Sequence, residues 1–534
     1  MNVITAEHIT KNYTGRLLFD DITFGFDDTD KVGIIGINGT GKSTLLNIIA
    51  GREEPDDGKI IKGNNIKIAF LEQNPILDEK LSILENVIGD ERENWDMEGS
   101  AKSILNKRGF TDYDKSPANL SGGEKKRVAL ARTILHPADV LILDEPTNHL
   151  DAQMAAWLEN FLKNYRGTVI MVTHDRYFLD KVTNKIYEID KGKIYSYETN
   201  YSGFLELKAQ REEMEIATER KNKSLYRMEL EWMMRGARAR STKQKAHIQR
   251  FENLRDRQKP VEEESMQLSS VSSRLGKKTI EIENVSKSFG DRKLFENFSY
   301  IFLRNDRIGI VGGNGCGKST LLKIIMDEIK PDTGHIEIGT TVKIGYFSQM
   351  NEYLDESQRV IDYVKETAEY IMTTQGRISA SAMCEKFLFD SQMQYSLIGK
   401  LSGGEKRRLY LLHVLMEQPN VLILDEPTND LDIKTMTILE DYLKTFDGIV
   451  ITVSHDRFFL DKIVNRIFSF ENGDIVQYEG GYSDFISVYN EKHKNDDVNG
   501  SISSYEKVKK ENQVQWKKEN KKVKFSYNEQ REFN

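Results

Sequence analysis

Two glycine-rich segments carry the residue types that hold phosphate groups. GINGTGKST spans residues 36–44, and GGNGCGKST spans residues 312–320. Each follows a short apolar run and precedes a helix-forming run, which is the context in which GxxxxGK[ST] cradles phosphates. Backbone N–H groups turn inward in such a loop, and the N-terminus of the next helix adds partial positive charge. The two segments therefore predict two nucleotide-binding loops.

Each loop supplies a cation and a hydroxyl for specific roles. We expect Lys42 and Lys318 to reach the β- and γ-phosphates, and the hydroxyls of Ser43 and Ser319 to hold Mg²⁺. The other predicted ATP-binding residues of the loops are Gly36, Asn38, Gly39, Gly41, Thr44, Gly312, Asn314, Gly315, Gly317 and Thr320.

An acidic pair ends the apolar run VLILDEP, which occurs twice. Asp144 and Asp425 are expected to complete the metal shell. Glu145 and Glu426 follow directly and are placed to polarise a water for in-line attack. A chance glycine turn is the alternative, and the repetition of both loop and acidic strand end argues against it. We predict an enzyme that hydrolyses ATP with Mg²⁺.

These motifs belong to an internal repeat. The glycine loops are offset by 276 residues, and the later motifs LSGGE, LILDEPTN and V[TS]HDR by 281. Apolar runs that end in these motifs alternate with helix-like segments, which indicates an α/β fold with a parallel sheet. The predicted domains are residues 1–200, an interdomain linker at 201–275, residues 276–490 and a basic polar tail at 491–534.

Composition narrows the class of protein. The chain has 534 residues, a net charge of −8 and two cysteines, Cys316 and Cys384. No run approaches the ~18 apolar residues that a membrane helix needs. The N-terminus lacks the features of a signal peptide. These observations predict a cytoplasmic protein and exclude secreted, membrane-spanning and fibrous classes.

The linker is expected to be a long α-helical hairpin. Residues 204–235 contain no proline or glycine, and their apolar residues recur at helical spacing. A second helix is expected over residues 241–259. Residues 232–250 contain six basic residues and no acid, so this tip would attract a phosphate backbone. A solvated helical hairpin is the alternative. The residues predicted to bind RNA are Arg235, Arg238, Arg240, Lys243 and Lys245.

The segments LSGGEKKR and LSGGEKRR resemble the signature motif of ATP-binding cassette domains. The resemblance implies two P-loop cassette domains in a head-to-tail sandwich, paired within one monomer. One ATP site would combine Lys42, Asp144 and Glu145 with the second signature, and the other would combine Lys318, Asp425 and Glu426 with the first. The implied signature contacts are Ser402, Gly403 and Gly404 for one site, and Ser121, Gly122 and Gly123 for the other.

The same resemblance assigns three further pairs of residues. Tyr13 and Phe289 would stack on adenine, although ordinary packing is the alternative. Gln73 and Gln349 would contact the metal and the attacking water. His174 and His455 would contact the γ-phosphate, and a hydrogen-bonded structural role is the alternative.

DEPTNHLD, DEPTNDLD and the linker sequence resemble the ABC-F family, and within it the Uup-like housekeeping branch. That resemblance implies a translation factor whose linker enters the tRNA exit site of the ribosome and contacts tRNA and ribosomal RNA. The chain departs from the pattern of that branch in two places. The first cassette is short between Gln73 and Ser121, and the chain stops before the family's C-terminal coiled coil. The second departure weakens the case for DNA binding.

Three other functions are also compatible with the sequence. A DNA-structure-binding ATPase of Uup type would depend on the basic tail. An antibiotic-resistance protein that protects the ribosome would usually carry a longer tip. The ATPase subunit of a membrane transporter would leave the basic tip without a role.

Overall fold

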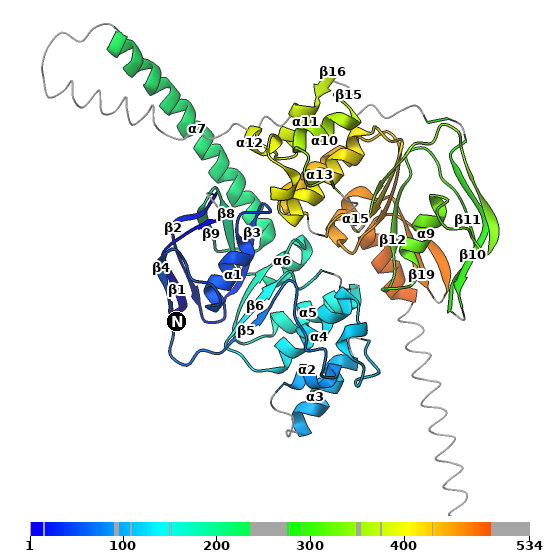
Figure 1. The fold of residues 1–534 in the computed structure, drawn as a ribbon, viewed down its shortest axis with the longest axis horizontal. Helices are drawn as coiled ribbons and strands as arrows, with labels where there is room; N and C mark the ends of the chain where they lie inside the picture. Colours follow the sequence, from blue (N-terminus) through cyan, green and yellow to red (C-terminus); the bar gives the residue numbers. More distant parts are fainter. Residues whose placement is uncertain are drawn as a thin grey trace, which may run out of the picture.

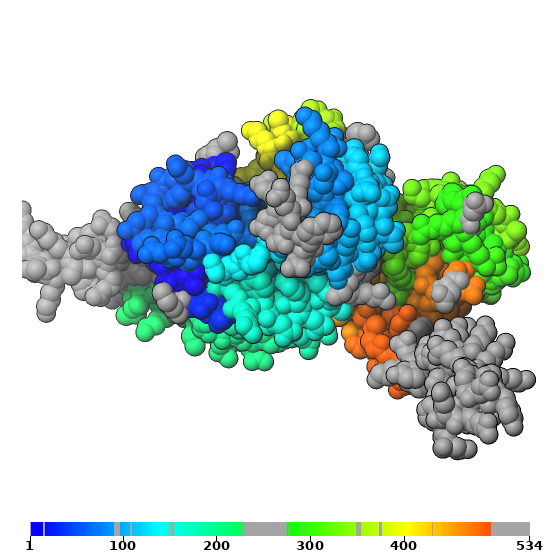
Figure 2. Space-filling model, turned by 90° about the horizontal axis from the view of Figure 1, so that it is seen from below, coloured from blue at the N-terminus to red at the C-terminus, as the bar shows by residue number. Residues whose placement is uncertain are grey.

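The computed structural model describes residues 2–13, 16–89, 95–106, 109–148, 150, 152–234, 275–276, 278–290, 292–348, 354–373, 376–429, 431–471 and 473–492. The residues predicted to bind RNA, Gln349 and the tail from residue 493 lie outside these ranges. The two repeats fold as two cassettes that lie side by side (Figures 1 and 2), and one long helix leaves the body (Figure 1).

The first cassette is built on a six-stranded sheet in the order β5-β6-β7-β3-β8-β9. Neighbouring strands are parallel, except that β9 pairs antiparallel with β8. The strands are β3 (Lys31–Gly36), β5 (Ile68–Leu71), β6 (Val140–Asp144), β7 (Thr168–Val172), β8 (Lys185–Asp190) and β9 (Lys193–Tyr197). A separate antiparallel sheet has the order β2-β1-β4. Its strands are β1 (Asn2–Tyr13), β2 (Arg16–Asp27) and β4 (Asp57–Lys62).

Hydrophobic layers cover both faces of the parallel sheet, as uninterrupted apolar strands require. Val140 and Ile142 of β6 pack toward the antiparallel sheet, whereas Leu141 and Leu143 pack toward the helical part, because successive side chains point to opposite faces. The helices are α1 (Lys42–Ala50), α2 (Ile83–Ile88), α3 (Trp95–Asn106), α4 (Gly122–Leu135), α5 (Ala152–Lys163) and α6 (Arg176–Val182), with a 3₁₀ turn η1 (Pro117–Asn119).

The second cassette repeats this plan. Its six-stranded sheet has the order β14-β17-β18-β12-β19-β20, and its antiparallel sheet the order β11-β10-β13. The strands are β10 (Ile280–Phe289), β11 (Arg292–Ile301), β12 (Arg307–Val311), β13 (Thr333–Ile338), β14 (Ile344–Phe347), β17 (Val421–Asp425), β18 (Ile449–Val453), β19 (Arg466–Glu471) and β20 (Asp474–Glu479). The predicted α/β class with parallel sheets is confirmed.

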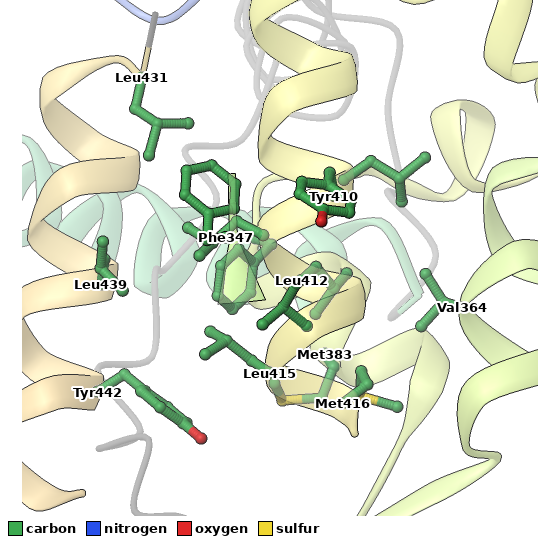
Figure 3. Packing of buried hydrophobic residues seen from close by; sticks show 14 of the residues in the cluster. Phe347, Val364, Met383, Tyr410, Leu412, Leu415, Met416, Leu431, Leu439 and Tyr442 are labelled. Atoms are coloured by element: carbon green, nitrogen blue, oxygen red, sulfur yellow. The ribbon is translucent and has the colours of Figure 1, made fainter. Parts of the chain in front are cut away.

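The helical part of the second cassette adds a hairpin, β15 (Tyr370–Thr373) with β16 (Gly376–Ser379). The helices are α9 (Lys318–Ile325), α10 (Val360–Thr367), α11 (Ala380–Lys386), α12 (Ser391–Gln394), α13 (Gly403–Met416), α14 (Ile433–Thr445) and α15 (Arg457–Ile463), with a 3₁₀ turn η2 (Ile398–Lys400). In the core of this part, Leu412, Leu415 and Met416 of α13 pack with Phe347 of β14 and Leu439 of α14 (Figure 3).

The long helix α7 (Tyr201–Met234) projects from the first cassette (Figure 1). At 1.5 Å per residue, its 34 residues extend roughly 50 Å. This helix confirms the first half of the expected linker, and the expected second helix lies outside the described residues. Among the helices that the structure describes, none is both long and apolar enough to cross a membrane.

Candidate functional site

The first glycine loop connects β3 to α1 and holds its lysine against the loop backbone. Lys42 Nζ donates to the carbonyl oxygens of Gly36 at 2.8 Å and Ile37 at 3.2 Å. Gly41 precedes the helix at φ 91°, in the left-handed region, and a Cβ there would lie 2.9 Å from the ring of Phe19. Glycine is therefore required at this position for both backbone conformation and space.

The second glycine loop has the same construction. Lys318 Nζ donates to the carbonyl oxygens of Gly312 at 2.9 Å and Gly313 at 3.2 Å. Gly317 precedes α9 at φ 116°. Both helix N-termini thus face a loop whose lysine is already turned toward the place that phosphates would occupy.

The two candidate catalytic glutamates share an unusual backbone. Glu145 and Glu426 have φ of 51° and 50°, in the left-handed region that non-glycine residues rarely adopt. The amide of Glu145 donates to Val172 at 2.8 Å, and the amide of Glu426 donates to Val453 at 2.9 Å, which holds each strained residue against the adjacent strand. Strain of this kind gathers at functional sites.

Each glutamate contacts the histidine of its own cassette. His174 Nε2 lies 3.2 Å from Glu145 Oε1, and His455 Nε2 lies 3.4 Å from Glu426 Oε1. Burial raises the pKa of Glu145 to about 8, and the Asp144 carboxylate adds to that rise. Burial also raises the pKa of Glu426 to about 7. Carboxylates with pKa values in this range can accept a proton near neutral pH, as a general base must.

Buried oxygen atoms without a hydrogen-bond partner point to where the metal and water would bind. Asp144 Oδ1, Glu145 Oε2, Asp425 Oδ1 and Glu426 Oε2 are buried and have no partner among the residues that the structure describes. The hydroxyl of Ser43 hydrogen-bonds the Asp144 carboxylate, and Ser319 does the same to Asp425. A hydroxyl beside an unsatisfied carboxylate oxygen is a donor set that suits Mg²⁺. These residues therefore fit the implied metal.

The signature serines begin helices through reciprocal side-chain bonds. Ser121 caps α4 by accepting from the Glu124 amide at 3.3 Å, while Glu124 accepts from the Ser121 amide at 2.9 Å. Ser402 and Glu405 form the same arrangement at the start of α13. The sequence SGGE is thus a capping box as well as a signature motif, and the cap presents the serine at a helix N-terminus.

The first loop meets the second signature across the cassette interface. The Asn38 amide donates to Asp432 Oδ2 at 3.1 Å. Gly404 lies against Asn38, since a Cβ on this glycine would stand 2.1 Å from Asn38 Nδ2. The structure therefore brings Lys42, Glu145 and the second signature to one place.

The second loop is open on the corresponding side. A cavity of about 370 Å³ surrounds Lys318, and its lining residues all come from the second cassette. Ser121 of the first signature is exposed, whereas Ser402 of the second signature is half-buried. In the described part of the chain, this loop and the first signature do not come together.

The remaining predicted residues lie at the edges of the loops. Phe289 lines the cavity around Lys318, and its ring is half-exposed. Tyr13 is similarly exposed, and its hydroxyl donates to Glu53 at 2.7 Å. Gln73 follows β5 and is exposed. Gln349 lies outside the described residues.

Sequence reasoning missed the residues that join the cassettes. Asp432 is the last residue of DEPTNDLD, and Arg176 belongs to V[TS]HDR, so both lie in the repeated motifs. Nothing in the sequence paired them with the other cassette, because a contact between Asn38 and Asp432 joins positions 394 residues apart.

Comparisons with known proteins agree with this site. Residues 19–148 and 295–429 match the ABC transporter family, and residues 187–270 match an extension family that is also described as ABC transporter. The chain is therefore a tandem ATP-binding cassette protein that binds and hydrolyses ATP. It belongs to the ABC-F type.

Two relatives match nearly the whole chain. The uncharacterized ABC transporter ATP-binding protein YfmR of Bacillus subtilis is 46% identical over 91% of this chain and 84% of its own length. The energy-dependent translational throttle protein EttA of Haemophilus influenzae is 36% identical over 88% of this chain and 92% of its own length. An archaeal ribosome recycling factor, aABCE1, has the same fold at a TM-score of 0.61 and 19% identity, with 90% and 92% of the chains covered.

Proposed function

We propose that this chain is a cytoplasmic, ribosome-associated translation factor in which ATP-driven closure of the cassettes moves the linker. The relative EttA, which is named a translational throttle protein, is 36% identical to this chain. The sequences of the linker and of the cassette motifs support membership of the Uup-like branch. The protein would act as a monomer, with Mg²⁺ held by Asp144 and Ser43 in one site and by Asp425 and Ser319 in the other.

One observation carries this proposal: the base of α7 is packed into the cassette interface. Tyr201 and Phe204 of α7 share a hydrophobic cluster with Ile35, which lies beside the first glycine loop. Ile433 of the second cassette packs against that cluster. A change in how the cassettes meet would therefore act directly on the base of the helix that leads to the basic tip.

Buried charges stiffen this base. Lys208 and Arg211 of α7 pair with Glu188 of β8 at 2.5 and 3.0 Å, and the Arg211 guanidinium stacks over Tyr195 at 3.9 Å. Because Glu188 is buried, its charge needs these partners. The first turns of α7 are thereby fixed to the first cassette, so that α7 moves with it.

In the mechanism, Glu145 and Glu426 accept the proton of the attacking water, and His174 and His455 hold these carboxylates and the γ-phosphate. The glycine loops and Lys42 and Lys318 orient the phosphates. Mg²⁺, when bound, would neutralise charge that develops on the phosphate oxygens. Closure would place tip residues at the tRNA exit site, where basic side chains contact tRNA and ribosomal RNA.

The test is sedimentation of Glu145→Gln/Glu426→Gln protein with ribosomes. The amides keep the shape but cannot accept a proton, so ATP should trap the closed form, and pelleting should require ATP. A matched variant with Arg235, Arg238, Arg240, Lys243 and Lys245 changed to Ala should stay in the supernatant. Pelleting that needs no ATP, or that survives loss of the tip charges, would contradict the proposal. The DNA-binding, ribosome-protection and transporter alternatives predict binding to structured DNA, antibiotic tolerance and membrane co-fractionation, respectively.

A further inference from the structure

The cassettes are joined on one side by a buried ion pair. Arg176 Nη1 of α6 lies 2.8 Å from Glu440 Oε1 of α14, and Arg176 Nη2 donates to the Ile433 carbonyl at 3.2 Å. Arg176 and Glu440 are 3% and 0% exposed. Lys462 also pairs with Glu440, at 2.5 Å. This contact fixes the start of α14 on the first cassette.

That contact borders the first ATP site. Asp432, which caps α14, is the residue that accepts from the Asn38 amide. Arg176 stands two residues after His174, whose ring contacts Glu145. Docking of α14 therefore orders one wall of the site from both cassettes at once.

The repeat offset of 281 residues maps this contact onto a second set of residues. Arg176 corresponds to Arg457, Glu440 to Glu159, and Ile433 to Ala152. On this side the structure has a cavity of about 730 Å³. Ala156 and Tyr177 line it from the first cassette, and every other lining residue belongs to the second.

The mirrored arginine already contacts the first cassette. The Arg457 guanidinium is 5.1 Å from the centre of the Tyr177 ring, as Arg176 is 5.3 Å from that of Phe458. Burial raises the pKa of the Asp175 carboxyl, while the charge of Arg457 lowers it and the charge of Glu159 raises it. The Glu159 carboxylate lies 2.7 Å from Lys163 of its own helix. Arg457 hydrogen-bonds Tyr482 of its own cassette. A change of partner by both Arg457 and Glu159 would complete the mirrored pair.

We propose that Arg457 and Glu159 are positioning residues of the second ATP site. When that site closes, Arg457 pairs with Glu159 as Arg176 pairs with Glu440, and the start of α5 moves into the 730 Å³ cavity. The first signature is thereby carried to Lys318. This inference rests on the ATP-driven closure of the proposed function. It adds that the two sites close through separate ion pairs.

The two cassettes differ in sequence at the position of Ile433, and this difference explains why one side is joined without nucleotide. Ile433 packs its partly buried apolar side chain against a cluster of the first cassette, whereas the corresponding residue in the sequence is Ala152, whose side chain is a single methyl group. The smaller apolar surface gives a weaker association. The second side consequently needs ATP to close.

The experiment counts the ATP that survives rapid gel filtration. Glu145→Gln/Glu426→Gln protein, the parent, should retain about two ATP per chain because both sites close around nucleotide. Arg457→Gln or Glu159→Gln in this parent should lower the count to about one. The exchange Arg457→Glu with Glu159→Arg should restore it. ATP retained by the first site shows that each variant is folded.

Changes at the glycine loops show which site was emptied. In a Lys318→Ala parent, which keeps only the first site, Arg457→Gln should cause no further loss. In a Lys42→Ala parent, it should remove the remaining ATP. The proposal would be overturned if the parent with Arg457→Gln still retained about two ATP per chain. Equal losses of ATP in the Lys318→Ala and Lys42→Ala parents would also overturn it. A parent that retains no ATP would instead refute the closure on which it rests.

Discussion

The buried carboxylate of Asp432 makes three contacts at the cassette interface. It caps α14 by accepting from the Thr435 amide at 2.8 Å, accepts from Asn38 of the other cassette, and lies 3.3 Å from the Arg408 guanidinium. Burial opposes its charge, yet Arg408 and the two amides hold its pKa below the usual value. The ionised form is therefore the one that the interface is built around.

We predict that Asp432→Ala is strongly destabilising. The change leaves Arg408, which is 2% exposed, without the carboxylate that it pairs with. Breaking a buried pair in this way costs about 3–5 kcal/mol. Urea unfolding measures the loss. As a control, Asp390→Ala removes an exposed cap of α12 and should cost only about 1 kcal/mol. Equal losses would show that Asp432 acts only as a cap.

At the scale of elements, helices α6 and α15 begin side by side between the cassettes. Asp175 caps α6 by accepting from the Phe178 amide at 2.9 Å, and Asp456 caps α15 by accepting from Phe459 at 3.0 Å. Burial raises the pKa of Asp456 to about 7, and the nearby charge of Asp175 adds to the rise. Two acidic caps thus share one interface, where Arg176 favours and Glu440 disfavours the ionised form.

This arrangement predicts a pH-dependent stability. A carboxyl whose pKa is raised in the folded state binds more protons there than in the unfolded chain, so stability falls as pH rises from about 4 to about 7. Asp456→Asn keeps an oxygen for the cap but does not titrate. Removing the buried charge should raise the free energy of unfolding by about 1 kcal/mol at pH 8. The melting temperature of the variant should then exceed that of the unaltered protein by about 2–4 °C. The difference should vanish near pH 4.5, and a constant difference would refute the prediction.

At the scale of the whole molecule, the two ATP sites differ in how complete they are. The first glycine loop contacts the second cassette through Asn38, whereas the cavity at Lys318 is lined by its own cassette. The 730 Å³ cavity lies on this more open side. The base of α7 belongs to the side that is already joined.

ATP should therefore compact the molecule by closing the second side. We expect the radius of gyration of Glu145→Gln/Glu426→Gln protein to decrease when ATP is added, as measured by small-angle X-ray scattering. Ala156→Trp places a large ring at the rim of the cavity and should prevent the decrease. Before ATP is added, both proteins should scatter alike. Compaction of the Trp variant to the same radius would show that this cavity stays open on closure.

Local patterns were sufficient for much of the fold and for the residues within each site. Apolar runs that end in Asp144 and Asp425 form buried parallel strands because strands covered on both faces must be continuously apolar. The proline- and glycine-free segment forms α7 because nothing interrupts its backbone bonds. The positive φ of Glu145 and Glu426 carried no signal, since non-glycine residues at that conformation depend on tertiary restraint.

By itself, the sequence determined the two phosphate loops, their lysines and hydroxyls, and the acidic strand ends, because each depends on neighbours within a few residues. Only the tertiary structure decided that Asp432 meets Asn38, that Arg176 pairs with Glu440, and that the mirrored Arg457 lines a cavity. These contacts depend on how two whole cassettes are placed. That placement reflects burial summed over an interface, which no local spacing of residues encodes.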